Sequence, residues 1–156
     1  MLITRIELRN IKSYEDADVE LEPGVTAICG HNGAGKSTLL EAIGATLFDY
    51  LPYSQAEFVR AGERWGEVAV TIRSALDERE YRVVRRFGAG ATHYVFDPEL
   101  GVHAAQGAEA VRRWLRQHLG IEHGAALKEL FADTIGVPQG LLTAIFLEAP
   151  QQRREK

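Results

Sequence analysis

Apolar and polar residues alternate from the first positions of the chain. Between residues 2 and 9, every second side chain is apolar or threonine, and the intervening ones are mostly charged. Residues 16–22 repeat the pattern, with an acidic residue at every second position. Each segment predicts a half-buried strand, because side chains of a strand point alternately to its two faces. We expect a hairpin through residues 10–15, in which the acidic face can pair with Arg5 and Arg9.

A buried strand and a helix are predicted next. The turn Pro23-Gly24 leads into the apolar run Val25–Cys29, which is long enough for one buried strand. Residues 38–49 are rich in helix formers with apolar residues at helical spacing, so we expect a helix that ends near Asp49. Residues 50–61 are predicted to form an irregular linker with one helical turn.

The rest of the chain predicts an antiparallel meander followed by helices. Alternating segments between residues 68 and 96 predict three strands, separated by turns at 76–79 and 88–90. Apolar residues at helical spacing between 108 and 119 predict a helix that Gly120 ends. A further helix is expected around 127–131, and residues 134–137 predict a short strand. Together the elements indicate an α/β fold.

Composition and charge limit the classes of protein to consider. The 156 residues suffice for one domain, and 46% hydrophobic with 26% charged residues is an ordinary globular composition. The net charge of −4 gives no overall basic field for nucleic acid. The arginines at 82–86 and 112–116 are predicted to lie on solvated faces rather than on a DNA surface, with Glu109 placed for an i,i+4 ion pair to Arg113.

The single cysteine and the lack of long apolar runs indicate where in the cell the protein is found. Cys29 cannot form an intrachain disulfide, and its place at the end of an apolar run predicts a buried structural thiol. No run approaches the ~20 apolar residues of a membrane span, and the N-terminus lacks the form of a signal peptide. We therefore expect a cytoplasmic protein without a membrane partner.

The segment Gly30–Ser37, GHNGAGKS, has the spacing of a phosphate-binding loop: a glycine, four residues, then Gly-Lys-Ser. It lies between the predicted strand and helix, as this chemistry requires. Glycines let backbone N–H groups approach phosphate oxygens without a Cβ in the way. The start of the helix adds about half a positive charge directed at the same phosphates.

The same segment supplies two functional side chains. Lys36 can reach the β- and γ-phosphates of ATP, and the Ser37 hydroxyl can be one ligand of an octahedral Mg²⁺. Hydrolysis also needs a carboxylate for the metal shell and a group that positions water. The nearest candidate, Tyr94–Asp97, is rejected because it suits a half-exposed strand that ends in a turn. The chain is therefore predicted to hold half of an active site.

Four segments of the chain resemble one group of ATPases. Residues 6–14 and 21–43 are similar to the N-terminal head segment of Rad50, SbcC and SMC ATPases. Residues 136–140, Gly-Val-Pro-Gln-Gly, resemble the Q-loop of these ABC-type ATPases, and the strand with Arg85-Arg86-Phe87 is more similar to Rad50 than to SMC. The resemblance covers nearly the whole chain and indicates a Rad50/SbcC-type (SMC-like) ATPase.

This resemblance implies an architecture and partners. Residues 1–147 are expected to be the N-terminal half of an ABC-type P-loop ATPase head, with the meander beside the phosphate-loop strand and helix. Residues 148–156 would be the truncated start of a coiled-coil helix. The family's signature motif, Asp/Glu strand and switch His belong to the C-terminal half of the head. Implied partners are this C-terminal half, a second head in a homodimer, an Mre11/SbcD-like nuclease and DNA, in the cytoplasm and at the nucleoid of a prokaryote.

Site residues carry over from the resemblance by position. The nucleotide-binding residues of the phosphate loop are Asn32, Gly33, Ala34, Gly35, Lys36, Ser37 and Thr38. Lys12 and Ser13 match an Arg/Lys-Ser pair that approaches the phosphates, although they suit an ordinary hairpin turn equally well. Gln139 matches the glutamine that touches Mg²⁺ and the attacking water. The implied catalytic residues are Lys36 and Gln139, the implied metal ligands Ser37 and Gln139, and the implied cofactors ATP and Mg²⁺.

Two other functions stay open beside the leading one. The leading expectation is the ATP-binding segment of a Rad50/SbcC-like ATPase in double-strand-break repair. Its hydrolysis would require the C-terminal half and head dimerisation, so this chain alone would be inactive or nearly so. An SMC-, RecF- or RecN-like ATPase in chromosome organisation or recombination would share these motifs. A nucleotide-binding interaction module without its own turnover would also contain a phosphate loop.

Overall fold

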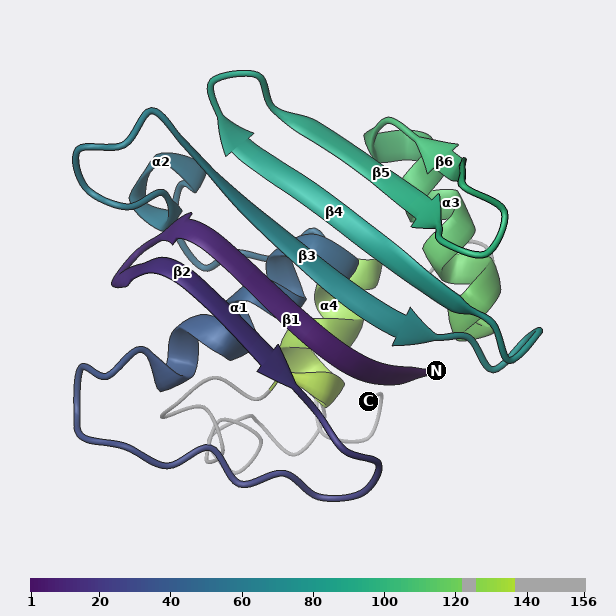
Figure 1. Ribbon diagram of the computed structural model, residues 1–156, viewed down its shortest axis with the longest axis horizontal. Helices are drawn as coiled ribbons and strands as arrows, with labels where there is room; N and C mark the ends of the chain where they lie inside the picture. The colour runs from purple at the N-terminus through teal and green to yellow at the C-terminus, as the bar shows by residue number, and fades with distance from the viewer. Residues whose placement is uncertain (122–125, 137–156) are drawn as a thin grey trace, which may run out of the picture.

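The computed structural model describes residues 1–121 and 126–136. One antiparallel sheet runs in the strand order β2-β1-β3-β4-β5-β6, and α1, α3 and α4 lie against one of its faces (Figure 1). The strands are β1 (Leu2–Ile11), β2 (Tyr14–Glu20), β3 (Trp65–Arg73), β4 (Glu80–Gly88), β5 (Thr92–Asp97) and β6 (Val102–Gln106). The helices are α1 (Lys36–Leu47), α2 (Gln55–Phe58), α3 (Ala108–Leu119) and α4 (Leu127–Leu130), followed by a π-helical turn (Phe131–Ile135). Within the described ranges, no helix has the length and apolar character needed to cross a bilayer.

The apolar faces of the central strands form the core against α1. Ile6 of β1 lies opposite Val70 of β3, and Leu8 lies opposite Val68. All four side chains are at most 1% exposed. Burying one such side chain contributes about 1.5–3 kcal/mol. The alternation seen in the sequence therefore fixes which face of the sheet receives the helices.

Most predicted elements are confirmed. β1 and β2 form the expected hairpin, in which Arg5 makes an ion pair with Asp18 and Arg9 lies opposite Asp16. The meander is present as β3, β4 and β5, and Gly120 ends α3 with a φ of 67°. β6 was not predicted, because its sequence, VHAAQ, shows no clear alternation and four of its five residues are exposed.

The apolar run Val25–Cys29 is not a strand, so this prediction was wrong. Val25 is fully exposed and Ile28 is 40% exposed. A strand needs a neighbour for its backbone N–H and C=O groups. None of the six described strands pairs with this run. Cys29 is exposed rather than buried for the same reason.

The predicted strand at 134–137 was also wrong over the residues that the structure describes, because Phe131–Ile135 form a π-helical turn. Short apolar runs do not distinguish strand from helix by periodicity alone. Packing decides here: the Phe131 ring lies 5.4 Å from that of Tyr50, centroid to centroid. A Cβ added to Gly44 would lie 2.6 Å from the Phe131 ring, so this glycine leaves space on α1 for the aromatic side chain.

Asp49, directly after α1, gathers three cationic side chains. Its carboxylate lies 2.7 Å from Arg85, 3.5 Å from Arg112 and 3.7 Å from Lys128. Burial opposes ionisation, but these cations, Arg85 foremost, hold the pKa of Asp49 below its usual value. The Arg85 side chain is only 12% exposed, so its prediction as part of a solvated face was wrong. It joins β4 to the end of α1.

The predicted i,i+4 pair between Glu109 and Arg113 on α3 is confirmed, at 3.3 Å on an exposed face. Arg82 pairs with Glu7 of β1 at 2.9 Å. These arginines therefore have carboxylate partners within the chain.

His93 of β5 is buried against α1. Its Nε2 lies 3.0 Å from the carbonyl oxygen of Thr46. Because a carbonyl can only accept, Nε2 carries the proton in this hydrogen bond. Burial, and next the charge of Arg85, lowers the pKa of His93 from 6.5 to about 4.

We expect the free energy of unfolding to fall as the pH drops from 6.5 towards 4, the unfolded and folded pKa values of His93. The unfolded state takes up the proton first, so stabilisation that is present above the unfolded pKa is lost through this window. The loss is on the order of 3 kcal/mol. Urea unfolding of the wild type and of His93→Gln, at neutral pH and near pH 4, checks this. The glutamine keeps a donor but does not titrate, so equal losses in both proteins would contradict the prediction.

Candidate nucleotide-binding site

The phosphate loop leads directly into α1, whose N-terminus is open. Gly35 is the N-cap with a φ of 89°, no side chain caps the helix, and no acidic residue occupies its first turn. The first N–H groups of a helix have no partner within it, and the helix dipole adds partial positive charge there. Anions are favoured at such a helix start. Gly33 is also left-handed, with a φ of 83°, which glycine adopts without strain.

The predicted loop residues differ in exposure, and the structure brings them together. Asn32, Gly33, Ala34 and Ser37 are exposed, Gly35 and Lys36 are half-buried, and Thr38 is buried. The ammonium of Lys36 donates to the carbonyl oxygens of Gly30 and His31, each at 2.7 Å. Lys36 therefore lies over its own loop. Charged phosphate oxygens would accept stronger hydrogen bonds than these neutral carbonyls.

The tip of the β1–β2 hairpin packs on the phosphate loop. A Cβ added to Gly35 would lie 2.7 Å from the Tyr14 ring and 2.9 Å from Ser13 Oγ. The Tyr14 hydroxyl lies 3.5 Å from the carbonyl oxygen of Ala34. Lys12 is left-handed, with a φ of 47°, which is uncommon for a residue with a side chain. Such conformations persist only where surrounding contacts hold them, and they cluster at functional sites.

Arg60 holds this tip in place. Its guanidinium donates to the carbonyl oxygen of Ser13 at 2.8 Å, and its backbone N–H donates to that of Asn10 at 2.9 Å. Sequence reasoning missed this role, because the two segments lie far apart along the chain. The contact places the segment after α2 beside the hairpin tip.

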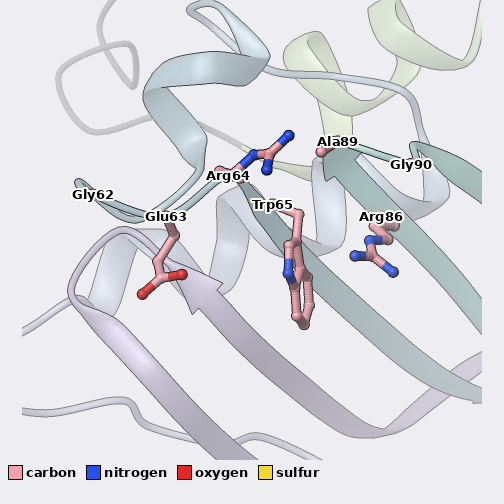
Figure 2. A pocket seen from close by; sticks show the side chains of 7 residues that line it. All are labelled: Gly62, Glu63, Arg64, Trp65, Arg86, Ala89 and Gly90. Carbon is pink, nitrogen blue, oxygen red and sulfur yellow. The ribbon is translucent and has the colours of Figure 1, made fainter.

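A shallow pocket lies farther along the same segment, at the end of the sheet where β3 begins and β4 ends (Figure 2). The Arg86 guanidinium lies 4.2 Å from the centroid of the Trp65 ring, a cation–π contact. Figure 2 shows Trp65 and Arg86 on the same side of the strands, with Arg64 turned away from them. Trp65 is half-buried here and has an arginine as its partner.

Lys12 has partners of its own on α1 and the linker. Its ammonium donates to Glu41 Oε2 at 2.8 Å and lies 4.1 Å from the centroid of the Tyr53 ring. The Tyr53 hydroxyl donates to the same oxygen at 2.6 Å. Sequence reasoning missed both partners. The available signal was the position of Glu41, one helical turn after Ser37 and on the same side of α1.

Asp97, the rejected carboxylate candidate, is held by partners at the end of β5. Asp97 is 3% exposed, pairs with Arg79 at 2.7 Å and accepts the backbone N–H of Glu99 at 3.0 Å. It is a turn residue, in agreement with its rejection as the metal carboxylate. Gln139 lies outside the described residues, as does the predicted start of a coiled-coil helix at 148–156.

Comparisons with known proteins now give the class. A solved structure from work on ATP-driven dimerization and DNA-stimulated activation of SMC ATPases superposes with a TM-score of 0.73. It is 23% identical and covers 99% of this chain and 96% of its own. A structure of the recombination mediator protein RecF with ATP has a TM-score of 0.56 at 25% identity, covering 65% of this chain and 27% of its own. The fold is thus the α/β fold of an SMC-type ATPase head, in its N-terminal half.

The family is shown by the sequence itself. The AAA_23 family, described as an AAA domain, matches residues 5–117, and the chain belongs to it. Rad50 ATPases of DNA double-strand break repair from Thermoplasma volcanium and Methanopyrus kandleri are 32% and 31% identical over 99% of the chain. The chain spans 17% and 18% of the length of these two relatives. The DNA replication and repair protein RecF of Streptomyces avermitilis is 38% identical over 58% of the chain and 24% of its own length.

Proposed function

We propose that this chain is the ATP-binding half of a Rad50/SbcC-like ATPase head that acts in DNA double-strand-break repair. The observation that carries the proposal is the phosphate loop: it opens at the uncapped start of α1, and the hairpin tip with Ser13 packs on Gly35. The similarity to Rad50 ATPases over 99% of the chain supports the same assignment.

The residues of the loop fit a nucleotide with its metal. The left-handed glycines and the N–H groups at the start of α1 would hold phosphate oxygens, and Lys36 would neutralise charge on the β- and γ-phosphates. The exposed Ser37 hydroxyl would be one Mg²⁺ ligand, with Gln139 as a second. The metal, when bound, lowers the charge that develops on the phosphates during hydrolysis. Ser13 and Lys12 would complete the phosphate side of the site.

Hydrolysis would need groups from outside the described residues. The site residues predicted from the sequence include no carboxylate that could bind the metal. The rejected candidate, Asp97, forms an ion pair with Arg79. The exposed apolar run Val25–Cys29 supports a second segment as well, because an unpaired apolar strand sequence gains both hydrogen bonds and burial when a neighbour pairs with it. We assign this neighbour to the C-terminal half of the head, with residues 1–147 as the N-terminal half and 148–156 as the start of the coiled coil.

The same proposal includes the partners of an assembled head. Two heads would sandwich ATP, and DNA and an Mre11/SbcD-like nuclease would bind the assembly. The SMC ATPase structure with the matching fold comes from work on ATP-driven dimerization and DNA stimulation of that class. A RecF-like ATPase of recombination is the second candidate, favoured by the match to RecF with ATP.

The proposal predicts saturable Mg-ATP binding by the chain, with Mg²⁺ tightening the affinity through Ser37. A fluorescent ATP analogue, titrated with and without Mg²⁺ and displaced by unlabelled ATP, measures this. Ser37→Ala should lose most of the Mg²⁺-dependent gain, and Ser37→Thr should retain it, because a hydroxyl remains. Failure of the wild type to bind ATP, or a full Mg²⁺ gain in Ser37→Ala, would overturn the assignment of this loop.

A further inference from the structure

One carboxylate on α1 binds both the lysine of the hairpin tip and a tyrosine of the linker. Glu41 Oε2 accepts hydrogen bonds from Lys12 Nζ at 2.8 Å and from the Tyr53 hydroxyl at 2.6 Å. The Lys12 ammonium also lies 4.1 Å from the centroid of the Tyr53 ring, so the tyrosine contacts both members of the ion pair. Three elements, the hairpin, α1 and the linker, therefore meet at one oxygen atom.

This cluster is held more firmly than a surface ion pair. The side chains of Lys12 and Glu41 are only 31% and 21% exposed. Partly buried charges attract each other more strongly than charges in bulk water. Burial, and next the hydrogen bond to Glu41, raises the pKa of Tyr53, which keeps its hydroxyl a donor. The carboxylate is thus oriented before any ligand arrives.

The cluster lies next to the phosphate loop. Glu41 follows Ser37 by one helical turn, and Ser13, the neighbour of Lys12, packs on Gly35. A single ammonium has three donors, but in this arrangement Glu41 and the Tyr53 ring bind its head group from two sides. A phosphate that approaches Lys12 therefore competes with Glu41 for the same ammonium.

We propose that Glu41 is a positioning residue that competes with the nucleotide phosphates for Lys12 and so sets the affinity of the site. Tyr53 orients the Glu41 carboxylate in this role. The inference rests on the proposed ATP-binding function and adds a residue to it. It predicts that neutralising Glu41 releases Lys12 and tightens Mg-ATP binding, and that this gain depends on the lysine.

A double-mutant cycle on the full chain tests the role. Mg-ATP dissociation constants are measured for the wild type, Glu41→Gln, Lys12→Met and the double variant. Glu41→Gln should tighten binding about three- to tenfold in the wild type, and less than about twofold in the Lys12→Met background. Glu15→Gln, which removes an exposed carboxylate elsewhere on the hairpin, controls for the change in net charge and should leave affinity within about twofold.

The outcomes separate this inference from the function on which it rests. If Glu41→Gln tightens binding equally with and without Lys12, the effect is general charge repulsion and the role of Glu41 is overturned. Weaker binding by Glu41→Gln would overturn it too, since Glu41 would then assist the nucleotide. If the wild type does not bind Mg-ATP at all, the proposed function itself fails.

A second readout follows Lys12 directly. The chain has four lysines, so ¹⁵N-lysine labelling gives few ammonium signals, and Lys12→Met assigns one of them. A hydrogen-bonded ammonium exchanges its protons with water more slowly than a free one. The Lys12 signal should be protected in the wild type, lose protection in Glu41→Gln and shift when Mg-ATP is added. An unprotected signal in the wild type would overturn the ion pair on which the inference depends.

Discussion

Replacing Lys36 by alanine is expected to weaken Mg-ATP binding about ten- to a hundredfold. The change removes charge-assisted hydrogen bonds to the β- and γ-phosphates, each worth about 1.5–3 kcal/mol, and about 1.4 kcal/mol is a factor of ten in affinity. Competition titration with a fluorescent ATP analogue gives the constant. The fold should survive, because among the described residues Lys36 donates to the carbonyl oxygens of its own loop and to no other element.

Lys128→Ala is the matched control for this variant. It removes the same charge from a side chain that is 62% exposed and whose ammonium lies 3.7 Å from Asp49, outside the phosphate loop. ATP affinity should stay within about twofold, as expected for a screened surface charge. If Lys36→Ala binds Mg-ATP as well as Lys128→Ala does, the phosphate loop is not the nucleotide site.

Gly35→Ala is expected to abolish measurable ATP binding and to destabilise the chain. The new methyl group would stand 2.7 Å from the Tyr14 ring and 2.9 Å from Ser13 Oγ, so the hairpin tip must move off the loop. The φ of 89° adds backbone strain of about 1–2 kcal/mol for a residue with a Cβ. Urea unfolding and ATP titration measure the two effects.

Gly33→Ala separates the effect of backbone strain from the effect of the steric clash with Tyr14 and Ser13. Gly33 has a similar φ of 83°, but a Cβ there meets nothing within 4 Å. Its loss of stability should therefore reflect backbone strain alone, whereas Gly35→Ala should lose more. Equal losses in the two variants would mean that the hairpin tip does not pack on the loop in solution.

Sequence patterns predicted those parts of the fold that are determined by residues close together in the chain. The alternation in residues 2–9 gave β1 and its buried face, because Ile6 and Leu8 must point to the same side of a strand. The glycine loop and the helix after it could be predicted as well, because the residues that define them are consecutive in the sequence.

Contacts between distant segments were not predictable in this way. The bond of Lys12 to Glu41, and the bond of Arg60 to the Ser13 carbonyl, join residues that are 29 and 47 positions apart. The run Val25–Cys29 shows the opposite error. Its apolar residues predict a strand correctly only if a neighbouring strand is present, and the described residues contain none for it.

The proposed split site is tested most directly by ATP turnover, measured for this chain with and without the polypeptide encoded downstream of residue 156. We expect negligible turnover by the chain alone and turnover that appears when the second polypeptide is added, since the metal carboxylate would come from that half. Lys36→Ala should abolish the reconstituted activity. Steady turnover by the chain alone, at the rate of the reconstituted protein, would contradict the account and would require a catalytic carboxylate within these 156 residues.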